Sequence, residues 1–244
     1  KECEKAKRAL SSTKEIKRVN LVMNYWQATA LNTAPDSENQ IHSDELAKEY
    51  GFKGGLVPGV TVSAYLLHPV IESFGEAWLA DGYANCKVSS PLYDGETFTV
   101  SSEILKEGCH NTFLKNQEGR IIANAESKLI INKHPEPKYR GDPLVQENFK
   151  APKASFAIWD ELKKEGCRAF EFHWGGKDPL IYLSDEGLLP EILQPKGGGF
   201  ANLCFLLGCS NWILAGNAFM NPWVHLQTKS QNYKPVSYTH LRAH

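Results

Sequence analysis

A long apolar segment at residues 60–74 constrains the fold more than any other part of the chain. Apolar side chains recur at helical spacing along one face of this segment, and the opposite face is also largely apolar. A helix that is apolar all round is buried, so other elements have to enclose it. Gly59 precedes the segment, Gly75 ends it, and Pro69 is expected to kink it. The two faces consist of Val60, Ala64, Leu67, Ile71 and Phe74 and of Val62, Leu66 and Val70.

Strand-like segments precede and follow this helix. One lies before it at residues 25–31, and Ser43 is placed to cap a short helix that runs to Tyr50. One strand, one buried helix and a strand meander predict an α+β fold in which a curved antiparallel sheet wraps around a central helix. The later strands are expected at 84–88, 96–105, 111–115 and 121–131, separated by the turn signals Asp94-Gly95, Glu107-Gly108 and Glu118-Gly119.

The same order of elements recurs in the second half of the chain. Residues 134–153 are rich in proline and charge, which is typical of an extended linker. A strand-like segment (167–174), the run Gly197-Gly198-Gly199, an apolar helix (201–215) and another strand-like segment (223–231) then follow in order. This recurrence predicts a tandem arrangement of one unit, with the first copy at residues 23–133 and a second, incomplete copy at residues 154–235.

Both ends of the chain are expected to lie outside these two units. Residues 1–22 are interpreted as a basic N-terminal extension. Residues 236–244 resemble a translated sequencing adaptor and continue no apolar pattern, so we expect a foreign or disordered tail that packs against nothing. The second unit would then be cut short after the first strand that follows its helix.

Composition excludes several classes of function. The chain carries 27 basic and 28 acidic residues, a net charge of -1, which gives no electrostatic reason to expect a nucleic-acid partner or an acidic membrane surface. No apolar run approaches the roughly 18 to 20 residues that a membrane span needs. The six cysteines are scattered, without metal-ligand spacing. Together with the lack of a signal-peptide pattern, this predicts reduced thiols, a cytoplasmic location, and no metal or other cofactor.

A group of residues before the apolar helix resembles a known enzyme family. Asn39-Gln40-Ile41-His42-Ser43-Asp44 is followed by Ala47, by Tyr50-Gly51-Phe52 and by Gly55-Leu56-Val57-Pro58-Gly59. This run resembles the MaoC-like (R)-specific enoyl-CoA hydratases of the hotdog superfamily, whose pattern is D-x-N-P-x-H-x-D, then A-x-x-x-G-F, then a hydrophobic pair and H-G. Ser90-Pro91-Leu92-Tyr93-Asp94-Gly95-Glu96 is similar to a strand entry of the same family. The resemblance covers about residues 25–131 and, with the repeat, implies a double hotdog.

The resemblance implies the reversible addition of water to a 2-enoyl thioester, with acyl-CoA or a related thioester as substrate and a homodimer as a compatible assembly. His42 matches the catalytic histidine, and imidazole suits proton transfer because it titrates near neutrality. Ser37 replaces the family's aspartate, which leaves Asp36 as the candidate catalytic partner. The free amides at the start of the helix are expected to receive the thioester oxygen, with Gly59 allowing its approach. The expected substrate-binding residues are Gly59, Asn39, Ser37, Ser63 and Tyr65.

Two other functions remain open. Hotdog proteins also hydrolyse thioesters, which usually requires a carboxylate or its equivalent on the central helix, and Glu72 is the only acid there. The replaced aspartate is also compatible with a non-catalytic acyl-thioester binding or assembly module. His68 and His225 are expected to be structural. The glycine run at 197–199 lacks the context of a phosphate loop and is interpreted as a flexible helix entry.

Overall fold

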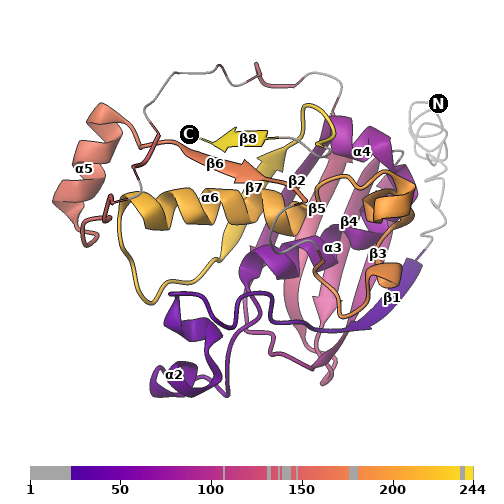
Figure 1. Cartoon of the computed structure of the whole chain (residues 1–244). Coiled ribbons are helices and arrows are strands. Elements are labelled where there is room, and N and C mark those ends of the chain that lie inside the picture. The colour runs from indigo at the N-terminus through magenta and orange to yellow at the C-terminus, as the bar shows by residue number, and fades with distance from the viewer. Residues whose placement is uncertain are drawn as a thin grey trace, which may run out of the picture.

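A computed structural model describes residues 23–106, 108–130, 133–136, 138, 144–146, 148–175, 181–236 and 240–243. The expected N-terminal extension at residues 1–22 lies outside these residues, and so does much of the expected linker. Figure 1 shows a sheet that encloses one helix, with further helices beside and beyond it.

A six-stranded antiparallel sheet forms the centre of the molecule. Its strand order differs from the chain order, because the first strand pairs with the third and the second strand pairs with the fifth. The expected strands of the first unit are all confirmed, with ends shifted by a few residues. In spatial order the strands are β1 (Met23–Thr29), β3 (Thr97–Lys106), β4 (Cys109–Lys115), β5 (Ile121–Leu129), β2 (Gly82–Val88) and β7 (Gln227–Gln231).

The apolar segment forms the central helix, α3 (Gly59–Phe74), and the sheet wraps around it (Figure 1). Its residues from Val60 to Ile71 are all buried, and Tyr65, Leu66 and Leu67 have no exposed surface. Gly75 ends the helix with a positive φ of 54°, a conformation that glycine adopts without strain. This strand order around an enclosed helix is the hotdog fold that the sequence predicted.

Three short helices flank the first unit. The predicted capped helix is confirmed as α2 (Asp44–Glu49), in which the Ser43 side chain accepts a hydrogen bond from the N–H of Leu46. It follows the short 3-10 helix η1 (Gln40–His42). The helix α4 (Glu76–Asp81), which the sequence did not predict, connects α3 to β2 and buries Trp78 and Leu79.

Residues 154–235, the predicted second unit, contain a strand, a helix and a strand in that order, and their being a second copy of the first unit stays a prediction. The strand β6 (Phe170–His173) is shorter than predicted, and the helix α6 (Leu203–Asn217) lies beside α3 (Figure 1). The strand that follows α6 is β7, which pairs antiparallel with β2 and so continues the sheet of the first unit. An unpredicted helix, α5 (Phe156–Glu165), precedes β6 and buries none of its residues. The 3-10 helices η2 (Glu186–Leu188), η3 (Glu191–Leu193) and η4 (Pro195–Gly197) lie between β6 and α6.

The two units share one hydrophobic core. Buried side chains from residues 182–207 belong to the same cluster as the side chains of α3. Polar contacts cross the same boundary: the hydroxyl of Thr61 on α3 lies 3.3 Å from the sulfur of Cys204 on α6. The second unit therefore completes the enclosure of α3. Its residues in this core are Tyr182, Leu183, Leu189, Leu193, Leu203, Cys204 and Leu207.

The end of the chain differs from the expectation that residues 236–244 pack against nothing. Val236 packs against the cluster around Trp174 and Phe205, and its carbonyl accepts a hydrogen bond of 2.7 Å from the N–H of Ala201. The backbone at β8 (His240–Ala243) pairs with β6. Unpaired backbone groups on β6 favour such pairing whatever the origin of the segment. That the tail is foreign to the chain stays a prediction.

Shortening a side chain of α6 within the shared core is expected to destabilise both units. Leu203 is 4% exposed, and Leu203→Ala should lower the free energy of unfolding by about 2 to 5 kcal/mol, because it removes buried methyl groups and leaves a cavity. Urea unfolding should show one transition at a lower midpoint, and hydrogen exchange should show weaker protection in β3 and β4. Leu214→Ala on the same helix is the control, because Leu214 is 42% exposed. Unchanged protection in β3 and β4 would mean that the units unfold separately.

A buried histidine on α3 should make the fold sensitive to acid. His68 has no exposed surface, and its ring stacks on Trp26 with the ring centroids 3.8 Å apart. Its Nδ1 lies 3.1 Å from the hydroxyl of Tyr182. Its Nε2 lies 3.3 Å from a carboxylate oxygen of Glu72, although the geometry there does not form a hydrogen bond. Burial lowers the pKa of His68 from 6.5 to about 3 and raises the pKa of Glu72.

The sign of the effect follows from proton uptake. The unfolded chain protonates His68 near pH 6.5, whereas the folded chain keeps it neutral to about pH 3, so stability falls as the pH drops across this window. We expect a loss on the order of a few kcal/mol, measured as urea midpoints between pH 7 and pH 4. His68→Phe should flatten this dependence, while His134→Ala, at an exposed histidine, should not. If the urea midpoint falls equally with pH in the wild type and in His68→Phe, the acid sensitivity does not come from His68.

Candidate functional site

A cavity of about 210 Å³ lies where the start of α3 meets residues 223–226 of the second unit. Most of the side chains that line it are apolar, and they come from both units. The apolar lining residues are Ile41, Phe52, Leu56, Val57, Pro58, Val62, Val88, Pro91, Leu92, Trp223, Val224 and Leu226, and the others are Asn39, His42, Gly59, Ser89, Ser90, Asn211 and His225.

His42 lines this cavity from the end of η1, and the loop before α3 holds its ring. The Nδ1 atom lies 2.7 Å from the carbonyl oxygen of Leu56. A carbonyl oxygen can only accept a hydrogen bond, so Nδ1 carries the proton and Nε2 keeps the lone pair. Burial lowers the pKa of His42 below its ordinary value, and the hydrogen bond to Leu56 opposes this only in part. His42 is therefore a neutral imidazole at pH 7, able to accept a proton on Nε2.

A glycine allows this loop to approach η1. A Cβ atom on Gly55 would lie 2.3 Å from the carbonyl oxygen of His42, so no other residue fits there without a backbone shift. The N–H of Leu56 donates to the carbonyl of Ile41 at 2.8 Å, which fixes the register of the two segments. The close approach of these segments brings the carbonyl of Leu56 to the His42 ring.

Asn39 joins His42 to the second unit. Its Nδ2 lies 3.3 Å from Nε2 of His42 and 2.9 Å from the carbonyl oxygen of Trp223, and its Oδ1 lies 3.2 Å from the N of Trp223. Asn39 is 7% exposed and lines the cavity. Asn39 is thus placed to orient the His42 ring, and its contacts to Trp223 were not predicted from the sequence.

Gly59 lines the same cavity as His42, but its lack of a side chain serves a different purpose from the one expected. A Cβ atom at Gly59 would lie 2.7 Å from the carbonyl oxygen and 2.8 Å from the Cβ of His225. The space beside the glycine is thus filled by the second unit and not left open for a ligand. The N–H groups of Gly59 and Val60 begin α3 and have no partner within the helix, so they remain candidate donors.

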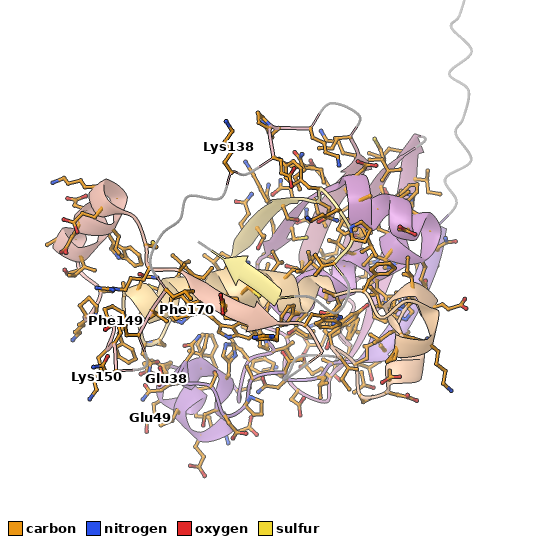
Figure 2. The ribbon with its side chains drawn as sticks, turned by 45° about the horizontal axis from the view of Figure 1, so that its top comes forward. Glu38, Glu49, Lys138, Phe149, Lys150 and Phe170 are labelled. Atoms are coloured by element: carbon orange, nitrogen blue, oxygen red, sulfur yellow. The ribbon has the colours of Figure 1, made fainter. Side chains whose placement is uncertain are left out.

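The other predicted site residues do not reach the cavity. Asp36 and Ser37 are exposed, on a turn that ends at Glu38, which lies at the surface near α2 (Figure 2). The hydroxyl of Ser63 donates to the carbonyl of Gly59 at 2.9 Å within α3. The hydroxyl of Tyr65 accepts from the N–H of Leu31 at 2.9 Å and is fully buried. Asp36 and Ser37 are therefore exposed and outside the cavity lining, and the hydroxyls of Ser63 and Tyr65 bond to backbone groups.

The second unit supplies polar groups that the sequence did not assign to the site. His225 has its Nδ1 3.3 Å from Oδ1 of Asn211 on α6, and its Nε2 bonds to the hydroxyl of Thr228 on β7. Burial lowers the pKa of His225, so it is also neutral at pH 7. Each unit thus presents one histidine bonded to one asparagine. The repeated order of strand and helix was the only signal in the sequence that could have placed His225 near the first unit.

The cavity is poor in charge. Among the described residues that line it there is no Asp, Glu, Lys or Arg. Across the described parts of the chain, no group of three or more His, Cys, Asp or Glu side chains is arranged to hold a metal ion. The chemistry available there is that of two neutral imidazoles, two amides, two serine hydroxyls and the first amides of α3. Within the described residues, no helix has the length and apolar character to cross a membrane.

No protein-family model matches the chain. Among solved structures, it is similar to a monoamine oxidase regulatory protein from Archaeoglobus fulgius, at 21% identity over 45% of this chain and 88% of that one, with a TM-score of 0.36. The (R)-hydratase from A. caviae involved in PHA biosynthesis matches at 18% identity over 45% and 96%, with a TM-score of 0.35.

A putative MaoC domain protein dehydratase from Chloroflexus aurantiacus J-10-fl matches at 12% identity, over 56% of this chain and 48% of that one, with a TM-score of 0.34. At these identities and TM-scores the similarity carries no argument about activity or substrate. The hotdog fold of this chain rests on its own strand order and on the helix that the sheet encloses.

Proposed function

We propose that this protein binds an acyl thioester in the cavity and catalyses the reversible addition of water to a 2-enoyl thioester. The observation that carries the proposal is the state of His42, a neutral imidazole with Nδ1 bonded to a backbone carbonyl, at an apolar cavity beside the start of α3. A general base of this kind suits operation near neutral pH.

The apolar lining fits the acyl part of such a substrate. The side chains of Leu92, Val224 and Leu226 form no hydrogen bonds, and no charged side chain among the described lining residues would compete for a polar group. The thioester oxygen gains negative charge during the reaction, and the free N–H groups at the start of α3 are suited to receive it. A donor placed in this way contributes about 3 to 4 kcal/mol in other enzymes.

In the proposed hydration step, water takes the place of the Asn39 N–H at the lone pair of Nε2. Nε2 of His42 then accepts a proton from this water as the water oxygen bonds to the β-carbon. The carbon–carbon π bond breaks, and its electrons move toward the α-carbon and the thioester oxygen. The imidazolium then returns the proton to the α-carbon, so a C–O bond and a C–H bond replace the π bond and one O–H bond of water, and His42 is neutral again. One group can perform both transfers if both carbons lie on its side, and positioned proton transfer of this kind contributes about 10²- to 10⁴-fold.

One observation favours a second candidate, a non-catalytic acyl-thioester binding module. No carboxylate belongs to the described lining, and Asp36 is exposed and outside it. A cavity that keeps the binding features but lacks a second strong acid or base would still hold a thioester. Hydrolysis is not favoured, because Glu72 lies toward the far end of α3, beside His68, and does not line the cavity.

Incubation with crotonyl-CoA separates the candidates. Loss of enoyl absorbance without release of thiol supports hydration, and release of thiol supports hydrolysis. Binding seen by calorimetry, with neither change, supports the binding module. Neither binding nor a chemical change would overturn both candidates.

Substitution of His42 and substitution of Asp36 should have very different effects on the rate of hydration. His42→Ala should abolish hydration of crotonyl-CoA and lower the free energy of unfolding by about 1 to 3 kcal/mol without preventing folding, because the carbonyl of Leu56 and the amide of Asn39 lose their partner. Asp36→Asn should leave the rate within about twofold, because an exposed surface residue rarely contributes more than a few tenths of a kcal/mol. His134→Ala is the control for loss of an exposed histidine. Turnover by His42→Ala at the wild-type rate would remove His42 from the mechanism.

A further inference from the structure

Residues 223–226 of the second unit line the cavity. Residues 221–226, called the wall below, are hydrogen-bonded to the segment that carries His42. The Nδ2 of Asn221 donates to the carbonyl of Glu38 at 2.7 Å, and the N–H of Gln40 donates to Oδ1 of Asn221 at 3.1 Å. Between these two positions, Asn39 bonds to both backbone groups of Trp223. These hydrogen bonds hold the wall against residues 38–40 of the first unit.

The backbone of Trp223 determines which way the Asn39 amide faces. The N–H of Trp223 can only donate, so it has to meet the amide oxygen. The carbonyl of Trp223 can only accept, so it has to meet the amide nitrogen. Both requirements give the same orientation, with one hydrogen of Nδ2 used by Trp223 and the other directed at Nε2 of His42, 3.3 Å away.

This orientation acts on the protonation of His42. A neutral ring with its proton on Nδ1 offers a lone pair on Nε2, which accepts from Asn39. An imidazolium ring would place an N–H on Nε2 against the N–H of Asn39, two donors facing one another. A hydrogen bond to the neutral form favours that form. The Asn39 amide cannot rotate to offer its oxygen without losing both bonds to Trp223.

We propose that Asn39 is a positioning residue through which the second unit holds His42 as a neutral imidazole with its proton on Nδ1. This inference rests on the proposed function for its importance, since the neutral ring is the form that accepts a proton from water. Detachment of the wall frees the Asn39 amide to turn and makes the imidazolium easier to form. The contact between the units thus sets the basicity of the site.

Few other charges face His42. Among the described residues that line the cavity, His225 is the one other ionisable side chain, and burial keeps it neutral as well. Asp44 begins α2 two residues after His42, but its Oδ1 accepts the N–H of Gly55 at 2.8 Å and it does not line the cavity. Asn39 is therefore the nearest polar side chain able to alter the protonation of Nε2.

The first test is the titration of His42 followed by NMR on the full chain, with His42→Ala used to assign the signal. Asn39→Ala should raise the pKa of His42 by about half a unit to one unit, because it removes one hydrogen bond to the neutral ring. Asn39→Asp should raise it further, by at least about one unit, because a carboxylate accepts from the imidazolium. An unchanged or lower pKa in both variants would overturn the positioning role.

The second test loosens the wall without touching Asn39 or His42. Asn221→Ala removes the bonds to Glu38 and Gln40 and should raise the pKa of His42 in the same direction as Asn39→Ala but by less. In the double variant Asn39→Ala/Asn221→Ala, the pKa of His42 should equal that in Asn39→Ala alone, because Asn221 acts through Asn39. Asn85→Ala is the matched control, because it removes a side-chain hydrogen bond between the units, from Gln227 on β7, that lies away from the cavity.

If the pKa of His42 in Asn221→Ala equals the wild-type pKa, the proposed effect of the second unit on His42 is overturned. Fully additive pKa shifts in the double variant would overturn it as well. The Asn221→Ala arm also keeps the proposal testable if Asn39→Ala fails to fold. The titration needs no substrate, so it is separate from the proposed function. Failure to hydrate crotonyl-CoA with the shifts present would overturn the proposed reaction alone.

Discussion

The structure depends on the burial of a helix that has no polar face. Because α3 is apolar around its circumference, a sheet on one side does not shield it, and each exposed apolar side chain would cost about 1.5 to 3 kcal/mol relative to burial. The strands of the first unit cover part of α3, and α6 with residues 182–193 covers the rest. The first unit thus needs the second unit to bury α3. The cavity lies where residues of the two units meet at the start of this helix.

The local parts of this arrangement could be predicted from the sequence, because they depend on spacing within short segments. The helical period of α3, the Ser43 cap and the strand meander are of this kind, and so is the placing of His42 and Asn39 before a glycine-marked helix. The helices α4 and α5 were missed because one is short and the other buries nothing, so neither has a clear pattern of burial.

The parts that could not be predicted depend on contacts between distant segments. Gly59 lies at the cavity, but the space beside it is occupied by His225, far along the chain, and this contact could not be predicted from the sequence. His225 and Asn211 reach the site only because β7 pairs with β2 and α6 lies beside α3, and no spacing in the sequence encodes that pairing. Asp36 was predicted as the catalytic partner because it is next to Ser37, which stands in place of the family's aspartate, but its carboxylate is exposed. The result is a cavity whose described lining holds imidazoles and amides but no carboxylate.

The close fit between Gly59 and His225 limits how this cavity can be remodelled. The backbone and Cβ of His225 lie against position 59, and even the methyl group of alanine is too large to fit between them and the helix. Enlarging or reshaping the pocket from the helix side alone would push the whole wall outward. Libraries that vary the two halves of the chain independently would therefore consist mostly of mismatched pairs, and useful diversity would be found by exchanging residues 59 and 221–226 together as one cassette.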